Sequence, residues 1–599
     1  MDVNERLEYL DREYLSDFDV SDVDIHANIE RQAAFDKPVY ETKPYAITED
    51  ESLEDNTYLS YNAVIGTSVD AKLYLAFQIL DYALVMTPGA PVKQALLDAG
   101  ISTDVYSSYE TSLYQPVYSI VAKNSNSKEQ GRFVSVINDT LEKLVKDGIN
   151  ERTIEAGINY YEFKYREADY GPYPKGLMYY LTMMDSWLYD ETKPFIHIEA
   201  GDTFDELKKN ARNGYFEKLI KEYLLDNNHK SIISLVPEYG LEKEKEQKEA
   251  DKLAEYKSTL TNDELEELVK KTKELKEYQD TPSSQEDLEK IPMLELSDIK
   301  REPAKDYNDV KSVDGIKIVH HNIFTNKIAY INLSFDTKCV PDELIPYMGL
   351  LGSTLSLMDT KNYTYPELTN EININCGGLA TGTALYSDKV DFSKNTIVYE
   401  VKSKALYEKV PFVLGMMEEI MYNTRFDDYK RLKEIIARIK SRLEASLMGQ
   451  GHSIAMLECC AQFSESAYYS DILRGYKYYE FIKKLDEEFE QNKTQIVDKL
   501  NKLVGYIFNK DNVIVSLTAD DEGYDCFAKA LSAKSCNIKD EHYNTAVRSF
   551  IPVNVKIGYT SASQVQYVAR CGNFVKDGYK YTGALKVLKV IFSYGLSLD

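Results

Sequence analysis

The sequence predicts an α+β fold in which one unit, an antiparallel sheet with helices on one face, is repeated and joined by a helical hairpin. Three observations predict it. The same order of strand-like and helix-like segments occurs twice, about 270 residues apart. Between the two copies, residues 241–280 are almost all Glu, Lys, Leu and Ala. The chain has 599 residues, 43% of them hydrophobic, which is ample for large cores.

The first copy runs from residue 58 to residue 238. Thr67 and Asp70 predict a capping box at the start of its first helix. Pro91 lies near the start of the next helix, and Gly100 lies just past its end. In order, the predicted elements are a strand, two helices, two strands, two helices and a strand: YLSYNAVIG, TSVDAKLYLAFQILDYALVM, PVKQALLDAG, TDVYSSYET, QPVYSIVAKN, residues 128–147, a helix from Glu151, and KSIISLVPE.

The second copy repeats this order. Gly377, Gly378 and Gly382 resemble an anion-binding nest, but a helix end followed by a strand explains them better. The corresponding segments are KIAYINLSFDT, ELIPYMGLLGSTLSLM, YPELTNEININCGG, LATGTALYSD, NTIVYEVKS, ALYEKVPFVLGMMEEIM, DDYKRLKEIIARIKSRLEASL and NVIVSLTAD.

The segment between the copies predicts a helical hairpin with charged outer faces. Thr261 and Glu264 form a capping box for its second helix, and Pro282 ends that helix. DTPSSQED then forms a linker. After residue 549 a third copy begins, with VQYVARCGNF as a strand and GYKYTGALKVLKVIFSYG as a helix. The start, ERLEYLDREYLSDFD, is typical of the closing helix of a further unit, so we expect the chain to be part of something longer.

Composition narrows the class of function. The net charge of −27 argues against nucleic acid, because phosphate binding needs a basic surface. It favours basic ligands, although acidity also simply aids solubility. No apolar run approaches the roughly 18 residues that span a bilayer, and no secretory signal is visible, so we expect a cytoplasmic protein without membrane contact. The seven cysteines indicate reduced thiols, mostly in cores, and the vicinal pair Cys459-Cys460 makes a poor metal site.

Motifs of independent catalysis are missing from the sequence. The seven histidines, including His26, give neither H-E-x-x-H nor H-x-x-E-H. Glu541-His542 comes nearest, but Ile538 stands where the first ligand would be. His320 and His321 are expected to be ordinary edge histidines, because successive strand residues face opposite ways. There is no phosphate loop, no dinucleotide fingerprint and no nucleophile elbow. The sequence therefore assigns no catalytic and no metal-binding residue.

The repeated units, the acidic hairpin and three stretches together resemble the insulinase-type zinc metallopeptidases, in the branch of presequence protease. The stretches are ERLEYLDREYLSDFD, TPGAPVKQALLDAGI and FSESAYYSDILRGYKYYEFIKKL. The resemblance implies four units in two halves that close around a chamber for short unfolded peptides. It implies zinc held by an inverted H-x-x-E-H motif in the first unit, and an Arg and a Tyr from the last. Neither segment is present here, so no family residue transfers.

The resemblance also implies a division of the chain: residues 1–40 as the tail of a catalytic unit, 41–240 as a second unit, 241–300 as the hinge, 301–545 as a third unit and 546–599 as the start of a fourth. On this reading the chain is part of a zinc endopeptidase and inactive alone. Zinc would bind the missing unit, and the partners would be that unit and basic peptides. The alternative is a non-catalytic subunit that binds peptides or acts as a scaffold.

Overall fold

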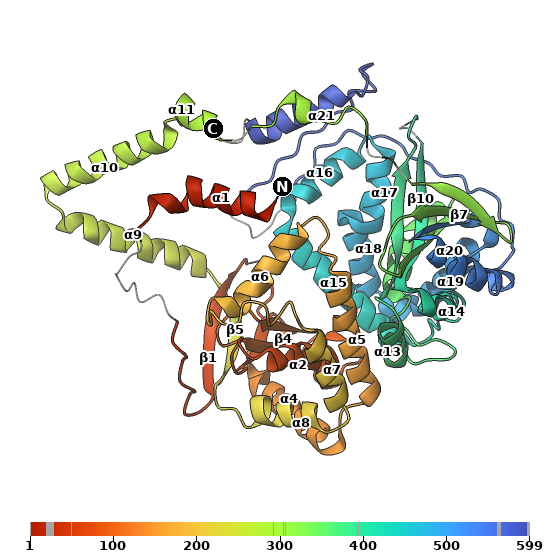
Figure 1. Ribbon diagram of the computed structural model, residues 1–599, viewed down its shortest axis with the longest axis horizontal. Coiled ribbons are helices and arrows are strands. Elements are labelled where there is room, and N and C mark those ends of the chain that lie inside the picture. Colours follow the sequence, from red (N-terminus) through yellow and green to blue (C-terminus); the bar gives the residue numbers. More distant parts are fainter. Residues whose placement is uncertain are drawn as a thin grey trace.

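The computed structural model describes residues 2–19, 29–49, 51–291, 293–303, 305, 307–391, 394–559 and 565–595. His26 lies outside these ranges. Two sheets with separate hydrophobic cores dominate the structure (Figure 1). We call residues 39–239 the N-terminal unit and residues 309–532 the C-terminal unit. The predicted α+β class, with repeated sheet-and-helix units joined by a hairpin, is confirmed.

The N-terminal unit contains a five-stranded sheet in the order β1-β5-β2-β4-β3. On β2, fully buried residues alternate with half-buried ones, so one face of the sheet packs on the core. The strands are β1 (Val39–Ile47), β2 (Thr57–Val64), β3 (Asp104–Glu110), β4 (Val117–Ser125) and β5 (Lys230–Tyr239). The helices are α2 (Ala71–Asp81), which runs into a π-helical turn (Tyr82–Met86), α3 (Pro91–Asp98), α4 (Gln130–Asp147), α5 (Glu151–Glu167), α6 (Lys175–Trp187), α7 (Gly201–Asn210) and α8 (Tyr215–Leu219).

The C-terminal unit contains a six-stranded sheet in the order β6-β7-β11-β8-β10-β9. The strands are β6 (Asp309–Val313), β7 (Ile316–Asn322), β8 (Ile328–Asp336), β9 (Leu379–Ser387), β10 (Asn395–Leu406) and β11 (Val513–Ala519). The helices are α12 (Ile345–Thr354), α13 (Tyr365–Asn375), α14 (Val410–Tyr422), α15 (Tyr429–Gly449), α16 (Gly451–Ala461), α17 (Glu465–Arg474), α18 (Tyr476–Glu487), α19 (Phe489–Ile507) and α20 (Asp521–Ser532).

The two sheets share one strand order. Without β6, the order β7-β11-β8-β10-β9 matches β1-β5-β2-β4-β3 strand for strand. The strands predicted as equivalents from the sequence, such as β2 with β8 and β5 with β11, occupy equivalent positions. Each sheet is mainly antiparallel but holds one parallel pair, β1 with β5 and β7 with β11. In each unit the last strand therefore lies between the first two strands.

Two local predictions concern the ends of helices. Asp70 alone caps α2, by accepting a hydrogen bond from the Leu73 amide, so the predicted Thr67 capping box is wrong. Asp70 is closer to the first turn and satisfies its free amide. Gly378 follows the end of α13 with φ of 110° and leads into β9, as a helix-ending glycine does.

One apolar segment is longer than the sequence analysis recognised. Residues Ala71–Asp98, which include α2 and α3, are long and apolar enough to cross a membrane by length and composition. Of the qualifying window, 72% is buried inside the structure. Leu80 and Leu84 are fully buried in the core of the N-terminal unit. This segment is therefore the central core helix of the unit, which must be apolar all round.

The predicted hairpin is present as α9 (Leu241–Thr259) and α10 (Asn262–Asp280). Thr261 and Glu264 form the predicted capping box. Both helices are exposed along their length and extend away from the two sheets (Figure 1). α1 (Val3–Glu13) likewise has no buried residue.

The beginning of the third copy is only half present. α21 (Gly583–Val590) forms where a helix is predicted. The described residues of VQYVARCGNF form no strand, so that prediction is wrong. A strand needs a neighbouring strand to satisfy its backbone groups, and none lies beside this segment in the described chain.

The two units contact each other mainly through α5 and α13. Polar groups make these contacts: Arg152 pairs with Glu371, Asn370 donates to Thr153, and Lys430 Nζ lies 2.7 Å from Asp98 Oδ1. Lys404 on β10 reaches Glu167 at the end of α5, with 2.6 Å between Nζ and Oε2. Gly377 lies against the ring of Phe163, where any Cβ would overlap the ring. These contacts fix how the two units face each other.

Candidate functional site

The described histidines are scattered over the structure. His197 stacks on Tyr74, and its Nε2 donates to the Ser68 carbonyl oxygen at 2.8 Å. Burial lowers the pKa of His197, so its ring is neutral at physiological pH. His229 packs edge-on against Phe35.

His320 and His321 are not edge histidines, because β7 lies between β6 and β11. His320 is fully buried, and its Nε2 lies 2.9 Å from the Ala519 carbonyl oxygen. His321, on the opposite face, lies 3.1 Å from Ser516 Oγ. The two rings face away from each other, so they cannot share one metal ion.

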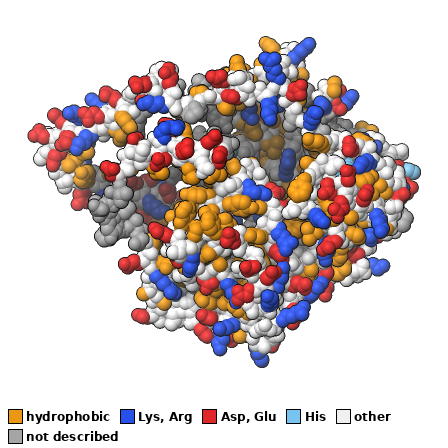
Figure 2. Space-filling model, viewed as in Figure 1, with side chains coloured by type: hydrophobic (Ala, Val, Ile, Leu, Met, Phe, Trp, Pro, Cys, Tyr) orange, Lys and Arg blue, Asp and Glu red, His pale blue; other side chains and the backbone are white. Residues whose placement is uncertain are grey.

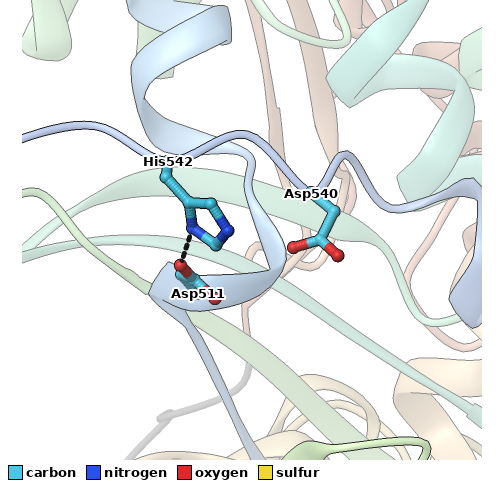
Figure 3. A group of neighbouring side chains, drawn as sticks. All are labelled: Asp511, Asp540 and His542. Carbon is cyan, nitrogen blue, oxygen red and sulfur yellow. Dashed lines mark hydrogen bonds and ion pairs between the residues drawn. The ribbon is translucent and has the colours of Figure 1, made fainter.

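One group of side chains in the described chain has metal-ligating atoms close together: Asp511, Asp540 and His542 (Figure 3). Their ligand atoms lie within 4.8 Å of one another, and all three residues are exposed. His542 Nδ1 is bonded to Asp511 Oδ2. Nearby, the Lys510 amide donates to the Lys539 carbonyl oxygen, which holds the two segments together. The group therefore acts as an exposed ion pair that closes a loop.

This group does not fit a peptidase zinc centre. Catalytic zinc in peptidases takes two histidines and a carboxylate in a partly enclosed pocket, with a second carboxylate as base. Here one exposed histidine already pairs with one of the two aspartates, and the group contains no second histidine among the described residues. No catalytic step through zinc is therefore derived for this chain.

The strongest candidate for a binding surface is the outer face of α6. Five large apolar side chains here are 40–63% exposed, and Figure 2 shows them as a hydrophobic patch. We call this the α6 face: Leu177, Tyr180, Leu181, Trp187 and Leu188. Contiguous apolar surface of this kind marks an interaction site in soluble proteins, since its exposure to water is unfavourable.

The segment following α6 anchors it to the N-terminal unit. Ser186, the one fully buried residue of α6, donates to the Lys193 carbonyl oxygen at 2.7 Å. Tyr189 donates to the Ser112 carbonyl oxygen at 2.8 Å. Asp185 accepts hydrogen bonds from Tyr74 and Thr111. The inner side of α6 is thus held by specific polar contacts, while the α6 face stays exposed.

A buried pair of carboxyl groups lies in the C-terminal unit. Glu458 on α16 and Asp471 on α17 are only 6% and 1% exposed. Lys477 Nζ lies 2.9 Å from Asp471 Oδ2 but 3.8 Å from Glu458 Oε1, so the lysine favours the aspartate. Burial, and then the negative charge of Asp471, raise the pKa of Glu458 to about 7.

This pair predicts a dependence of stability on pH. Glu458 keeps its proton to about pH 7 when folded, whereas the unfolded chain releases it near pH 4.5. Folding stability is therefore expected to fall as pH rises from about 4.5 to 7, by about 1–3 kcal/mol. Glu458→Gln should remove this slope in chemical unfolding at pH 5 and pH 8, whereas exposed Glu487→Gln should keep it. An unchanged slope in Glu458→Gln would contradict the assignment.

Sequence analysis missed all three features of this section. The Asp540-x-His542 spacing is a weak signal for a cation-binding loop, but Asp511 comes from another segment. The α6 face was hidden because its apolar period is that of an ordinary buried helix. The buried carboxyl pair depends on how α16 meets α17.

Comparison with known proteins identifies the class. The family model described as "Peptidase M16 inactive domain" matches residues 1–161, and the model of the region associated with peptidases of the M16 family, subfamily C, matches residues 235–485. The chain is 38% identical over 598 residues to "Protein HypA" of Clostridium perfringens, a match that covers 99% of this chain and 60% of that protein. It is 28% identical over 586 residues to "Presequence protease 1, chloroplastic/mitochondrial" of Arabidopsis thaliana, which covers 96% of this chain and 54% of that one.

The repeated sheet units and these matches place the chain in the insulinase-type M16 metallopeptidase family. Within that family it belongs to the branch of presequence protease. Among solved structures, that of pitrilysin aligns with 84% of this chain and 49% of its own, at 12% identity and a TM-score of 0.39. The chain thus spans about half to three-fifths of the length of the relatives that it matches.

Proposed function

We propose that this chain is the non-catalytic part of a presequence-protease-like zinc endopeptidase that degrades short unfolded peptides in a closed chamber. Its membership of the presequence protease branch carries the proposal. The scattered histidines support the further proposal that the chain does not cleave peptides alone. Zinc, with the water that it activates, would be held by a catalytic unit supplied from elsewhere.

The proposed roles follow the predicted division of the chain. Residues 41–240 and 301–545 would be successive units of the chamber wall, and residues 241–300 would be the hinge. The identical strand order of the two sheets supports the first assignment, and the exposed α9 and α10 support the second. Residues 1–40 and 546–599 would belong to flanking units.

The α6 face would contact the peptide. Its apolar side chains suit the hydrophobic side of an unfolded peptide, and the net charge of −27 favours a basic one. A cytoplasmic location is proposed on composition alone.

The test is metal content and peptidase activity on one purified sample. We expect less than about 0.1 zinc per chain after dialysis and no chelator-sensitive cleavage of a fluorogenic basic peptide. An exposed, partly occupied cluster should lose its metal under these conditions. One zinc per chain with chelator-sensitive cleavage would overturn the proposal, and His542→Ala would then show whether the cluster in Figure 3 holds that zinc.

A second function, peptide binding without cleavage, is favoured by the α6 face. The one tryptophan of the chain, Trp187, lies on this face and is 40% exposed. Titration of the same peptide should therefore change its fluorescence. Saturable binding that Leu181→Ser weakens and Phe324→Ser does not would support a binding subunit, since Phe324 is exposed elsewhere. Absence of any change would leave only the role of a wall completed by other units.

A further inference from the structure

The last part of the chain crosses the outside of the C-terminal unit without forming helix or strand. We call residues 549–559 and 565–575 the C-terminal strap. It is held by a few separate contacts with α16, α17 and α18. These are the Val553 amide on the Gln462 carbonyl oxygen at 2.8 Å, and the ring pairs Tyr468–Phe550, Tyr476–Tyr559 and His452–Tyr567.

The contacts of the strap are weak for its length. Val568 is 92% exposed and Ile551 is 77% exposed, so the strap buries little apolar surface. Its described residues also form no ladder of backbone hydrogen bonds to a neighbouring strand. A segment held in this way opens easily, because few contacts must break together.

Three thiols meet where the strap crosses α16. Cys460 Sγ on α16 lies 3.3 Å from Cys571 Sγ on the strap. Cys571 Sγ also lies 3.9 Å from the Met456 carbonyl oxygen, and Cys459 Sγ lies 3.8 Å from the Ala569 carbonyl oxygen. All three cysteines are half-buried, so small oxidants can reach them.

We propose that Cys460 and Cys571 form a reversible disulfide under peroxide, and that this disulfide fastens the C-terminal strap to α16. The two sulfur atoms need to approach by only about 1.3 Å to reach bonding distance. Two other cysteines are placed differently: Cys339 and Cys376 are buried, with their sulfur atoms on the Tyr506 and Ile372 carbonyl oxygens.

The chemistry balances with hydrogen peroxide as the oxidant. One thiolate attacks a peroxide oxygen, the O–O bond breaks, and a sulfenic acid and hydroxide form. The second thiol then attacks the sulfenic sulfur, the S–S bond forms, and water leaves. In total two thiols are oxidised, and one peroxide is reduced to two waters. A dithiol reductant reverses the reaction, as expected of a redox-responsive disulfide in a reducing compartment.

Cys460 rather than its neighbour Cys459 is assigned as the partner. Adjacent residues of a helix point about 100° apart, so one of the two faces the strap more directly. The Cys460 sulfur is the one placed 3.3 Å from Cys571, whereas Cys459 lies against the strap backbone at Ala569.

The disulfide would close a loop of 111 positions that contains α17 to α20 and β11. The strap could then no longer leave α16 without breaking a covalent bond. Oxidation would thus convert an easily opened segment into a fixed part of the C-terminal unit.

The test uses the full chain, purified reduced, treated with hydrogen peroxide, and digested under non-reducing conditions for mass spectrometry. We expect a Cys460–Cys571 peptide pair as the main disulfide, lost on reduction. Limited proteolysis within residues 549–575 should slow by at least about fivefold in the oxidised protein. Cys460→Ser should abolish both effects, whereas Cys526→Ser, also half-buried, should change neither.

Three results would overturn the proposal. One is the absence of an intramolecular disulfide in the wild-type chain, a measurement that needs no variant. Another is a main disulfide between Cys459 and Cys571, with Cys459→Ser rather than Cys460→Ser abolishing it. The third is an unchanged rate of proteolysis in protein that carries the Cys460–Cys571 bond.

Discussion

Phe508→Ala is expected to destabilise the C-terminal unit by about 3–5 kcal/mol. Phe508 is fully buried at the end of α19, and its ring lies 5.1 Å from that of Phe335 and 5.5 Å from that of Tyr399. Removing the ring leaves a cavity at the centre of these aromatic contacts, which the surrounding rings cannot fill without leaving their rotamers. Urea unfolding followed by circular dichroism should show a large fall in the midpoint.

The location of the effect can also be measured. Trp187, the single tryptophan, lies in the N-terminal unit, which has its own core. Its fluorescence transition should therefore move much less than the circular dichroism transition. Phe324→Ala is the matched control, because Phe324 is 82% exposed and its loss should cost less than about 0.5 kcal/mol. Equal effects of the two substitutions would contradict the described core.

Lys404→Met is expected to weaken the contact between the two units by about 3 kcal/mol. Its Nζ lies 2.6 Å from Glu167 Oε2, and the Glu167 side chain is only 5% exposed. Without the lysine, the carboxylate stays buried and unpaired, which costs much more than the pair itself contributes. Denaturant unfolding of the variant, with Trp187 and circular dichroism recorded together, measures the loss.

The double variant Glu167→Met with Lys404→Met should recover most of this stability, because it removes the buried charge. Lys402→Met on the same strand is the matched control. Glu400, the partner of Lys402, keeps hydrogen bonds from Asn332 and Tyr386, so this change should cost less than about 1 kcal/mol. Simple addition of the two single effects in the double variant would mean that the pair is not coupled.

Where local pattern determines structure, the sequence predicted it well. The repeated strands were found because buried residues alternate along them, as on β2 and β11. β1 was missed because most of its residues are exposed, so no alternation marks it. The parallel pairing of β1 with β5 was missed for another reason: strand order depends on contacts between distant segments, which local pattern does not record.

The candidate sites follow the same division. The absence of a zinc motif could be read from spacing alone, because such a motif lies on one helix. The expectation that the cysteines lie mostly in cores was wrong, since only Cys339 and Cys376 of the six described cysteines with assigned burial are buried. The contact of Cys460 with Cys571 joins residues 111 positions apart, and the charge pair of Lys404 with Glu167 joins two units. No local signal predicts either.

The shared strand order has a consequence for how the chain folds during synthesis. β5 lies between β1 and β2, although roughly 165 residues separate it from β2 along the chain. Until residue 239 has left the ribosome, β1 and β2 each present an unpaired edge to the surroundings. β11 completes the second sheet in the same way, between β7 and β8. Each unit is thus topologically closed by its final strand, so a nascent chain stalled before that strand carries open edges that invite aggregation.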